Sequence, residues 1–200
     1  MNFFIQGKTG IGKSYTIRES LKNHVEHTEG FMVQRLYEDN NLWGFRAGII
    51  EDTLVSLDAG PDAANKDGIF LSPEGKDLSV LEGIISQVEK NFWKPSCRVV
   101  VLDEIGGFEL CSDIFMTTLY RILDSDRLCV GVLKSQENLM HTLKGRGFDA
   151  GEQTKLYLGR HDQLKRVIES NGILYTMTDD NRDQIQEKLQ TYIDQYTPFM

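Results

Sequence analysis

Short apolar runs and longer segments of helical periodicity alternate along most of the chain. The runs have the length and composition of buried β-strands and cover residues 2–6, 98–103, 127–133 and 173–177. Elsewhere apolar residues recur every three or four positions, which predicts amphipathic helices. These are expected over 13–23 and 78–92, after Ser112, from His161-Asp162 and after Asp179-Asp180. We therefore expect an α/β fold, with a mostly parallel sheet flanked by helices on both faces.

A β-rich block interrupts this alternation. Two segments with strand composition, 31–37 and 42–50, flank the polar turn 38–41, a pattern typical of an antiparallel hairpin. Residues 53–57 have the composition of a third strand. Together they predict a hairpin insertion near residues 30–58. Residues 58–75, rich in Pro, Gly, Asp and Asn, are expected to form a long loop with a short strand at 69–71.

Composition and charge narrow the class of ligand. The 200 residues are expected to form one domain, residues 1–200, and their net charge of −8 argues against general binding of nucleic acid or an anionic membrane. Residues 1–24 differ, because four basic residues against Glu19 alone give this segment a charge of +3. A basic site in an acidic chain suits a small anion better than a polymer.

The sequence predicts a cytoplasmic protein without a membrane partner. No stretch approaches the roughly 20 apolar residues of a membrane span, and a strand entering a loop by residue 7 does not resemble a signal peptide. Cys97, Cys111 and Cys129 are odd in number and far apart, which suggests reduced thiols rather than a disulfide framework or a zinc site. His24 and His27 are expected at the solvated end of a helix.

A glycine-rich loop follows the first predicted strand and leads into the first predicted helix. It fits the phosphate-binding pattern G-x-x-x-x-G-K-[ST], in which glycines let backbone N–H groups approach phosphates at a helix N-terminus. The pattern predicts that Lys13 reaches the β- and γ-phosphates and that Ser14 ligates Mg²⁺. The predicted nucleotide-binding residues are Gly7, Lys8, Thr9, Gly10, Ile11, Gly12, Lys13, Ser14 and Tyr15.

Two acidic residues end the buried strand at 98–103. A carboxylate at the end of such a strand is costly unless it serves a function, and in phosphate-loop NTPases the first acid holds Mg²⁺ while a neighbouring glutamate polarises water. Asp103 is therefore predicted to be a metal ligand together with Ser14, and Glu104 to be catalytic together with Lys13.

Further basic residues are weaker candidates. Lys134 follows the strand at 127–133 and would face the γ-phosphate if that strand lies between the first strand and 98–103. It is then a possible sensor of transferred charge, and otherwise a solvated loop lysine. Residues 136–160 are broken by glycines, and their basic side chains could approach a phosphate or face water. These are Lys144, Arg146, Lys155 and Arg160.

Four segments together resemble the THEP-type nucleoside-triphosphatase family of phosphate-loop proteins. They are the loop 7–14, the hairpin from Gly30-Phe31 to Gly44-Phe45, the segment 101–110 with its Asp-Glu-Ile-Gly start, and Asn181-Arg182-Asp183. The resemblance implies a mostly parallel sheet and slow Mg²⁺-dependent hydrolysis of several nucleoside triphosphates. The chain departs from the family pattern at Leu133-Lys134, where the family tends to have histidine and arginine, and over 140–160, which is longer.

The expected activity is hydrolysis of ATP, GTP and other nucleoside triphosphates to the diphosphate and phosphate, with Mg²⁺ as cofactor. A small-molecule kinase would share the phosphate loop, and the 58–75 loop is long enough to form its acceptor pocket. A nucleotide-dependent switch that hydrolyses only incidentally is a further alternative. Glu109 and Asn181 fit the family motifs, but the sequence indicates no mechanism for either. Asn181 could contact the base of the nucleotide or cap the last helix.

Overall fold

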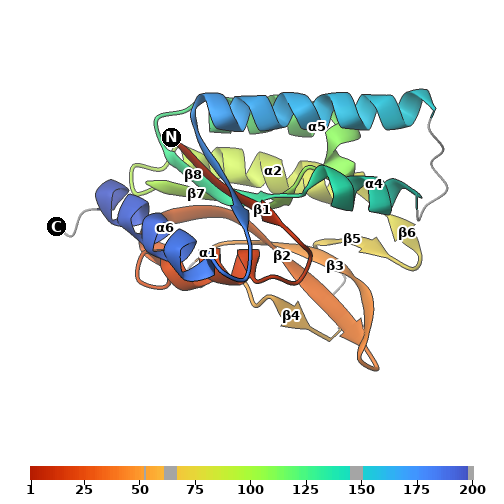
Figure 1. Ribbon diagram of the computed structural model, residues 1–200, viewed down its shortest axis with the longest axis horizontal. Coiled ribbons are helices and arrows are strands. Elements are labelled where there is room, and N and C mark those ends of the chain that lie inside the picture. The colour runs from red at the N-terminus through yellow and green to blue at the C-terminus, as the bar shows by residue number, and fades with distance from the viewer. Residues whose placement is uncertain (52, 61–66, 145–150, 198–200) are drawn as a thin grey trace.

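The computed structural model describes residues 1–51, 53–60, 67–144 and 151–197. They form a nine-stranded sheet in the order β6-β5-β3-β2-β7-β8-β1-β9, with β4 paired to β2 (Figure 1). The strands are β1 (Asn2–Gly7), β2 (Thr28–Glu38), β3 (Asn41–Ile49), β4 (Asp58–Ala59), β5 (Ile69–Ser72), β6 (Gly75–Lys76), β7 (Val99–Ile105), β8 (Leu128–Leu133) and β9 (Gly172–Met177). The helices are α1 (Lys13–Leu21), α2 (Leu78–Phe92), α3 (Asp113–Leu123), α4 (Gln136–Lys144), α5 (Glu152–Ser170) and α6 (Arg182–Tyr196), with 3₁₀ turns at Val25–His27 and Phe108–Cys111.

Five strands form the parallel part of the sheet. β2, β7, β8, β1 and β9 lie side by side and pair in parallel. Successive residues of a strand point to opposite faces, so Val99 and Val101 pack in one hydrophobic cluster while Val100 and Leu102 pack in the other. The continuous apolar run therefore lies in a strand that is buried on both faces, as predicted.

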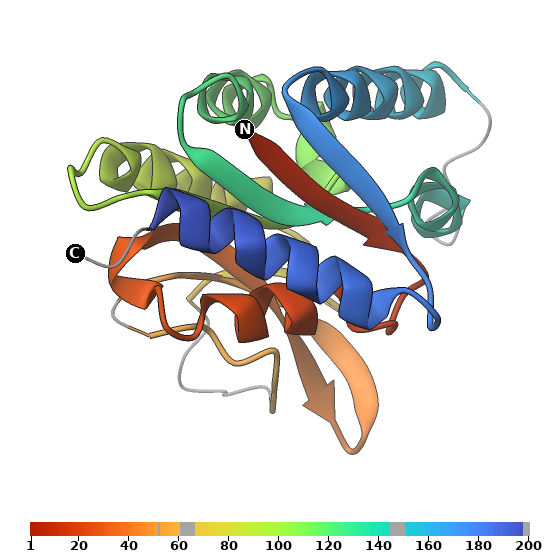
Figure 2. The same cartoon turned by 60° about the vertical axis from the view of Figure 1, so that its left-hand side comes forward.

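Helices cover both faces of this sheet. α1 and α6 pack side by side on one face, where Ile17 and Leu21 meet Ile185 and Leu189 (Figure 2). α2, α3, α4 and α5 cover the other face (Figure 1). The predicted α/β architecture is confirmed. None of the described helices is long and apolar enough to cross a membrane.

The predicted hairpin is an extension of the parallel sheet. The first part of β2 pairs with β7 in parallel, and the rest runs on beyond β7 as the antiparallel partner of β3. Asp39 and Asn40 make the two-residue turn with φ angles of 47° and 63°. Asp and Asn tolerate this left-handed conformation better than most residues, which explains their position in a tight hairpin.

Two local expectations about secondary structure were wrong. Residues 53–57 do not form a strand. They run beside β2 without regular pairing, and the backbone N–H of Arg35 donates to the Leu57 carbonyl at 2.8 Å. The helix expected from His161 begins nine residues earlier, at Glu152. Buried Thr154, Tyr157, His161, Leu164 and Ile168 continue its apolar face through Gly159, which does not break the helix.

His24 is also placed differently from the prediction. Its side chain is buried, with Nδ1 2.8 Å from Thr197 Oγ1 and Nε2 3.2 Å from Asp194 Oδ1. These contacts join the end of α1 to the end of α6. His24 is therefore part of the packing between the two helices.

Candidate active site

The glycine-rich loop connects β1 to α1, as the sequence predicted. Gly7, Gly10 and Gly12 all have positive φ angles, of 145°, 81° and 100°. Gly7 has a second constraint, since a Cβ atom there would stand 2.7 Å from the Met177 carbonyl oxygen of β9. Gly12 is the N-cap of α1, so the loop ends at a helix N-terminus, where backbone N–H groups favour an anion.

Lys13 lies over the centre of this loop. Its Nζ donates to the carbonyl oxygens of Lys8 at 2.9 Å and Gly7 at 3.2 Å, and its side chain is almost fully buried. Burial lowers the pKa of Lys13, whereas the carboxylates of Glu104 and Asp103 act in the opposite direction. The loop therefore holds a buried cation within reach of both acids.

Asp103 and Ser14 meet although 89 positions separate them. The Ser14 hydroxyl donates to Asp103 Oδ1 at 2.8 Å, and the backbone N–H of Val33 donates to Asp103 Oδ2 at 3.0 Å. Burial and the neighbouring Glu104 carboxylate raise the pKa of Asp103 to about 7. A divalent cation beside this buried carboxylate would favour its charged form.

The donor set at this point suits Mg²⁺ with a bound nucleotide. Within the described ranges, no three His, Cys, Asp or Glu side chains gather in a way that could hold a metal ion. Mg²⁺ commonly takes one or two protein oxygens and completes its shell with water and substrate phosphates. The hydroxyl of Ser14 and the carboxylate of Asp103 fit this pattern.

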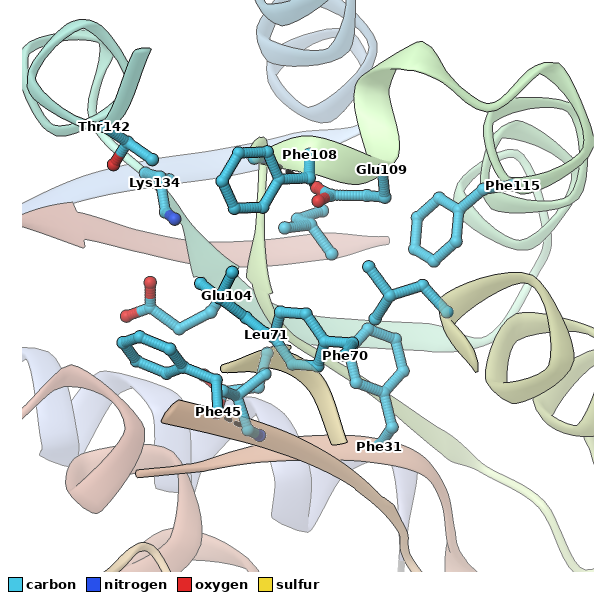
Figure 3. Close-up of a pocket in the computed structure, with 15 residues that line it drawn as sticks. Phe31, Phe45, Phe70, Leu71, Glu104, Phe108, Glu109, Phe115, Lys134 and Thr142 are labelled. Carbon is cyan, nitrogen blue, oxygen red and sulfur yellow. Dashed lines mark hydrogen bonds between the residues drawn. The ribbon is translucent and has the colours of Figure 1, made fainter. Parts of the chain in front are cut away.

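Glu104 lies at an irregularity of β7. From Leu102 to Ile105, β7 has one residue more than the facing segment of β8 from Gly131 to Leu133. Glu104 takes up this extra residue with a φ of 55°, a conformation that costs a non-glycine residue of order 1–3 kcal/mol. Its side chain lines the pocket drawn in Figure 3. Its charge acts on the buried ammonium of Lys13.

Lys134 reaches the same pocket from β8. That strand lies between β1 and β7, which is the condition under which the sequence placed Lys134 near the γ-phosphate. Its ammonium faces Glu104 across the pocket (Figure 3), and its charge contributes to lowering the pKa of Lys13. The Lys134 carbonyl lies 2.6 Å from Nε2 of the buried His161, which ties this turn to α5.

Glu109 supports the turn that follows Glu104. Its buried carboxylate accepts hydrogen bonds from the backbone N–H groups of Gly106 and Gly107, the latter at 2.8 Å. Burial raises the pKa of Glu109, while the Gly107 N–H and the charge of Lys134 act in the opposite direction. The family motif thus contains a carboxylate that fixes the backbone next to the bulge.

Replacing Glu109 by alanine should destabilise the fold and slow turnover together. The two buried N–H groups would lose their acceptor, at a cost of about 2 kcal/mol in unfolding free energy. Urea unfolding and steady-state phosphate release measure the two effects. Glu109→Gln keeps an acceptor oxygen and should recover most of both. Equal unfolding midpoints for Glu109→Ala and wild type would contradict this role.

Two arginines near the loop escaped the sequence reasoning. Arg35 follows Val33 on β2, beyond the point where β2 contacts Asp103, and its charge helps to lower the pKa of Lys13. Arg182 begins α6, with its Nε 3.7 Å from the point where a Cβ on Gly12 would stand. The sequence contained one indication of these arginines, which was the position of Arg182 in the family motif.

Asn181 ties the turn before α6. Its Oδ1 accepts the Thr178 N–H at 2.8 Å and its Nδ2 donates to the Thr176 carbonyl at 3.0 Å. It occupies the N-cap position of α6, where its carbonyl accepts the Ile185 N–H at 3.0 Å, but its side chain makes no capping hydrogen bond.

Two of the other basic residues considered from the sequence, Arg160 and Lys155, do not join the site. Arg160 donates to the Leu110 carbonyl and pairs with Asp113 at 2.6 Å, and Lys155 is exposed. Arg146 and the side chain of Lys144 lie outside the described residues. Tyr15, like Lys8, Thr9 and Gly10, is exposed beside the loop.

Comparison with known proteins decides the family. A family model described as NTPase matches residues 2–168. The chain belongs to this NTPase family. The resemblance to THEP-type nucleoside-triphosphatases, drawn from four sequence segments, is thereby confirmed.

Individual relatives of this NTPase have low sequence identity, but their alignments cover most of the chain. Nucleoside-triphosphatase THEP1 of Thermotoga sp. (strain RQ2) is 27% identical over 158 residues, 73% of this chain and 82% of that protein. THEP1 of Thermofilum pendens is 24% identical over 197 residues, 94% of this chain and 92% of that protein.

Two solved structures share the fold. The crystal structure of THEP1 from the hyperthermophile Aquifex aeolicus aligns with a TM-score of 0.63 at 20% identity, over 97% of this chain and 99% of that chain. The solution structure of a human cancer-related nucleoside triphosphatase aligns with a TM-score of 0.58 at 18% identity, over 97% of each chain. The fold is therefore that of a phosphate-loop NTPase.

Proposed function

We propose that this chain hydrolyses nucleoside triphosphates, including ATP and GTP, to the diphosphate and phosphate with Mg²⁺ as cofactor. The observation that carries the proposal is the convergence of the phosphate loop and the end of β7, where Ser14 Oγ donates to Asp103 Oδ1 at 2.8 Å. Residues 1–200 would act as one domain, in the cytoplasm and without a nucleic-acid or membrane partner.

In this proposal each group has one task. Backbone N–H groups of residues 9–14 and the Lys13 ammonium bind the phosphates. Ser14 and Asp103 hold Mg²⁺, which neutralises charge on the transferred phosphoryl group when bound. Glu104 accepts a proton from the attacking water.

The geometry around Glu104 supports the activation of a single water molecule by this carboxylate. Its side chain is half-buried and lines the same pocket as Lys134, and its charge acts on Lys13. A carboxylate held there can orient a water molecule against the γ-phosphorus while the two ammonium groups stabilise developing negative charge. Lys134 is the proposed sensor of that charge.

Arg35 gives a specific prediction. Because its charge reaches Lys13, Arg35→Ala should lower kcat by roughly tenfold to a hundredfold, through the loss of charge stabilisation in the transition state. Steady-state phosphate release and ADP titration separate this effect from binding. Arg98→Ala is the control, since Arg98 is exposed at the opposite end of the parallel strands. An unchanged kcat in Arg35→Ala would exclude Arg35 from the reaction.

A further inference from the structure

A largely apolar cavity adjoins the proposed catalytic carboxylate. It has a volume of about 110 Å³ and reaches from Glu104 into the space between the hairpin, β5 and α3 (Figure 3). Five phenylalanines line it: Phe31, Phe45, Phe70, Phe108 and Phe115. An engineered apolar cavity of roughly 150 Å³ binds benzene, so a space of this smaller size admits at most one aromatic ring.

Hydrolysis of a nucleotide does not require the phenylalanine-lined walls of this cavity. The phosphates lie on the loop, and the attacking and leaving oxygens stand in line across the γ-phosphorus. The leaving diphosphate and the nucleoside must therefore extend away from Glu104, which stands on the side of attack. The base of the same nucleotide cannot fill a cavity on that side.

The polar end of the cavity defines what its occupant must carry. Glu104 brings a carboxylate and Lys134 an ammonium group, and they face each other at this end (Figure 3). A carboxylate accepts hydrogen bonds and an ammonium group donates them. A single hydroxyl group can satisfy both, because it donates and accepts.

We propose that this cavity binds a compact aromatic alcohol, with its ring among the phenylalanines and its hydroxyl between Glu104 and Lys134, where it replaces the attacking water. This inference rests on the proposed function, because it takes Glu104 as the residue that holds that water. Ring burial supplies the apolar contribution to affinity and the hydroxyl supplies orientation. The occupant would thus control whether water can reach the γ-phosphorus.

Benzyl alcohol is the test probe, with toluene as the matched ring without a hydroxyl. With Mg²⁺ and ATP, benzyl alcohol should lower phosphate release by the wild-type protein at least threefold and saturably, in roughly the millimolar range expected of so small a ligand. Toluene should lower it much less. ³¹P NMR of the same samples detects benzyl phosphate. The site is supported by reduced phosphate release with or without that product, since either requires the hydroxyl to displace water.

Variants of the cavity wall make the test specific. Leu71→Trp should fill the cavity and Phe70→Ala should remove part of its wall, and both should retain basal hydrolysis while losing most of the response to benzyl alcohol. Leu42→Trp on the exposed hairpin is the control and should respond like wild type. No response in wild type, or an equal response in Leu71→Trp, would overturn the proposal.

Binding without nucleotide separates this inference from the hydrolase proposal. Saturation-transfer NMR of benzyl alcohol should show contact with wild type and a loss of contact with Leu71→Trp, whatever the hydrolytic activity. Contact that is equal in both proteins refutes the cavity site. The wild-type protein could instead show contact that is lost in Leu71→Trp and yet release no phosphate. This result would refute the hydrolase proposal and the replacement of the attacking water, but not the binding of benzyl alcohol in the cavity.

Discussion

Replacing Lys13 by alanine should weaken nucleotide binding about a hundredfold and bring phosphate release to background. The ammonium is buried over the loop and would donate to the β-phosphate of ADP, and a charge-assisted hydrogen bond contributes about 1.5–3 kcal/mol. Loss of the same charge in the transition state lowers turnover further. Titration with ADP and steady-state phosphate release measure the two effects.

Lys22→Ala, at the opposite end of α1, provides the control. Lys22 is exposed and pairs with Glu19, so its removal leaves the loop untouched. Binding of ADP by Lys13→Ala with wild-type affinity would contradict the assignment of the phosphate site.

Replacing Glu104 by glutamine should separate binding from chemistry. The amide has nearly the shape of the carboxylate but cannot take a proton from water, and loss of a general base lowers rates by about 10²–10⁴-fold. Glu104 makes none of the loop contacts that would hold phosphates, so the variant should bind Mg²⁺–ATP with near wild-type affinity. Calorimetric titration measures that affinity.

Glu187→Gln on the exposed side of α6 controls for the change in net charge. If Glu104→Gln lost ATP affinity and turnover in equal proportion, Glu104 would be a binding residue and not the base.

The position of the candidate phosphate loop in the fold could be predicted from sequence because the pattern that indicates it is local. The spacing of Gly7, Gly12, Lys13 and Ser14 encodes both the loop and its position between strand and helix. Asp103 was predicted to hold Mg²⁺ together with Ser14 because the first acid after such a strand does so in phosphate-loop NTPases. Lys134 was expected near the γ-phosphate if its strand lay between the first strand and 98–103, and β8 does lie between β1 and β7.

The missed features depend on tertiary structure. The bulge at Glu104 is a shift in register between β7 and β8. No local sequence pattern encodes this shift. Arg35 reaches the site because β2 runs past β7, which its own composition does not indicate. The start of α5 was missed because glycine was treated as a breaker, although packing of Tyr157 and His161 stabilises the helix on both sides of Gly159.

The most direct test of the central claim is phosphate release from ATP and from GTP, with Mg²⁺ or with EDTA, by wild type beside Glu104→Gln. The account predicts steady release by wild type only with Mg²⁺, and a rate at least a hundredfold lower in Glu104→Gln. It would be contradicted by equal rates in the two proteins, or by a wild-type protein that binds Mg²⁺–ATP and releases no phosphate.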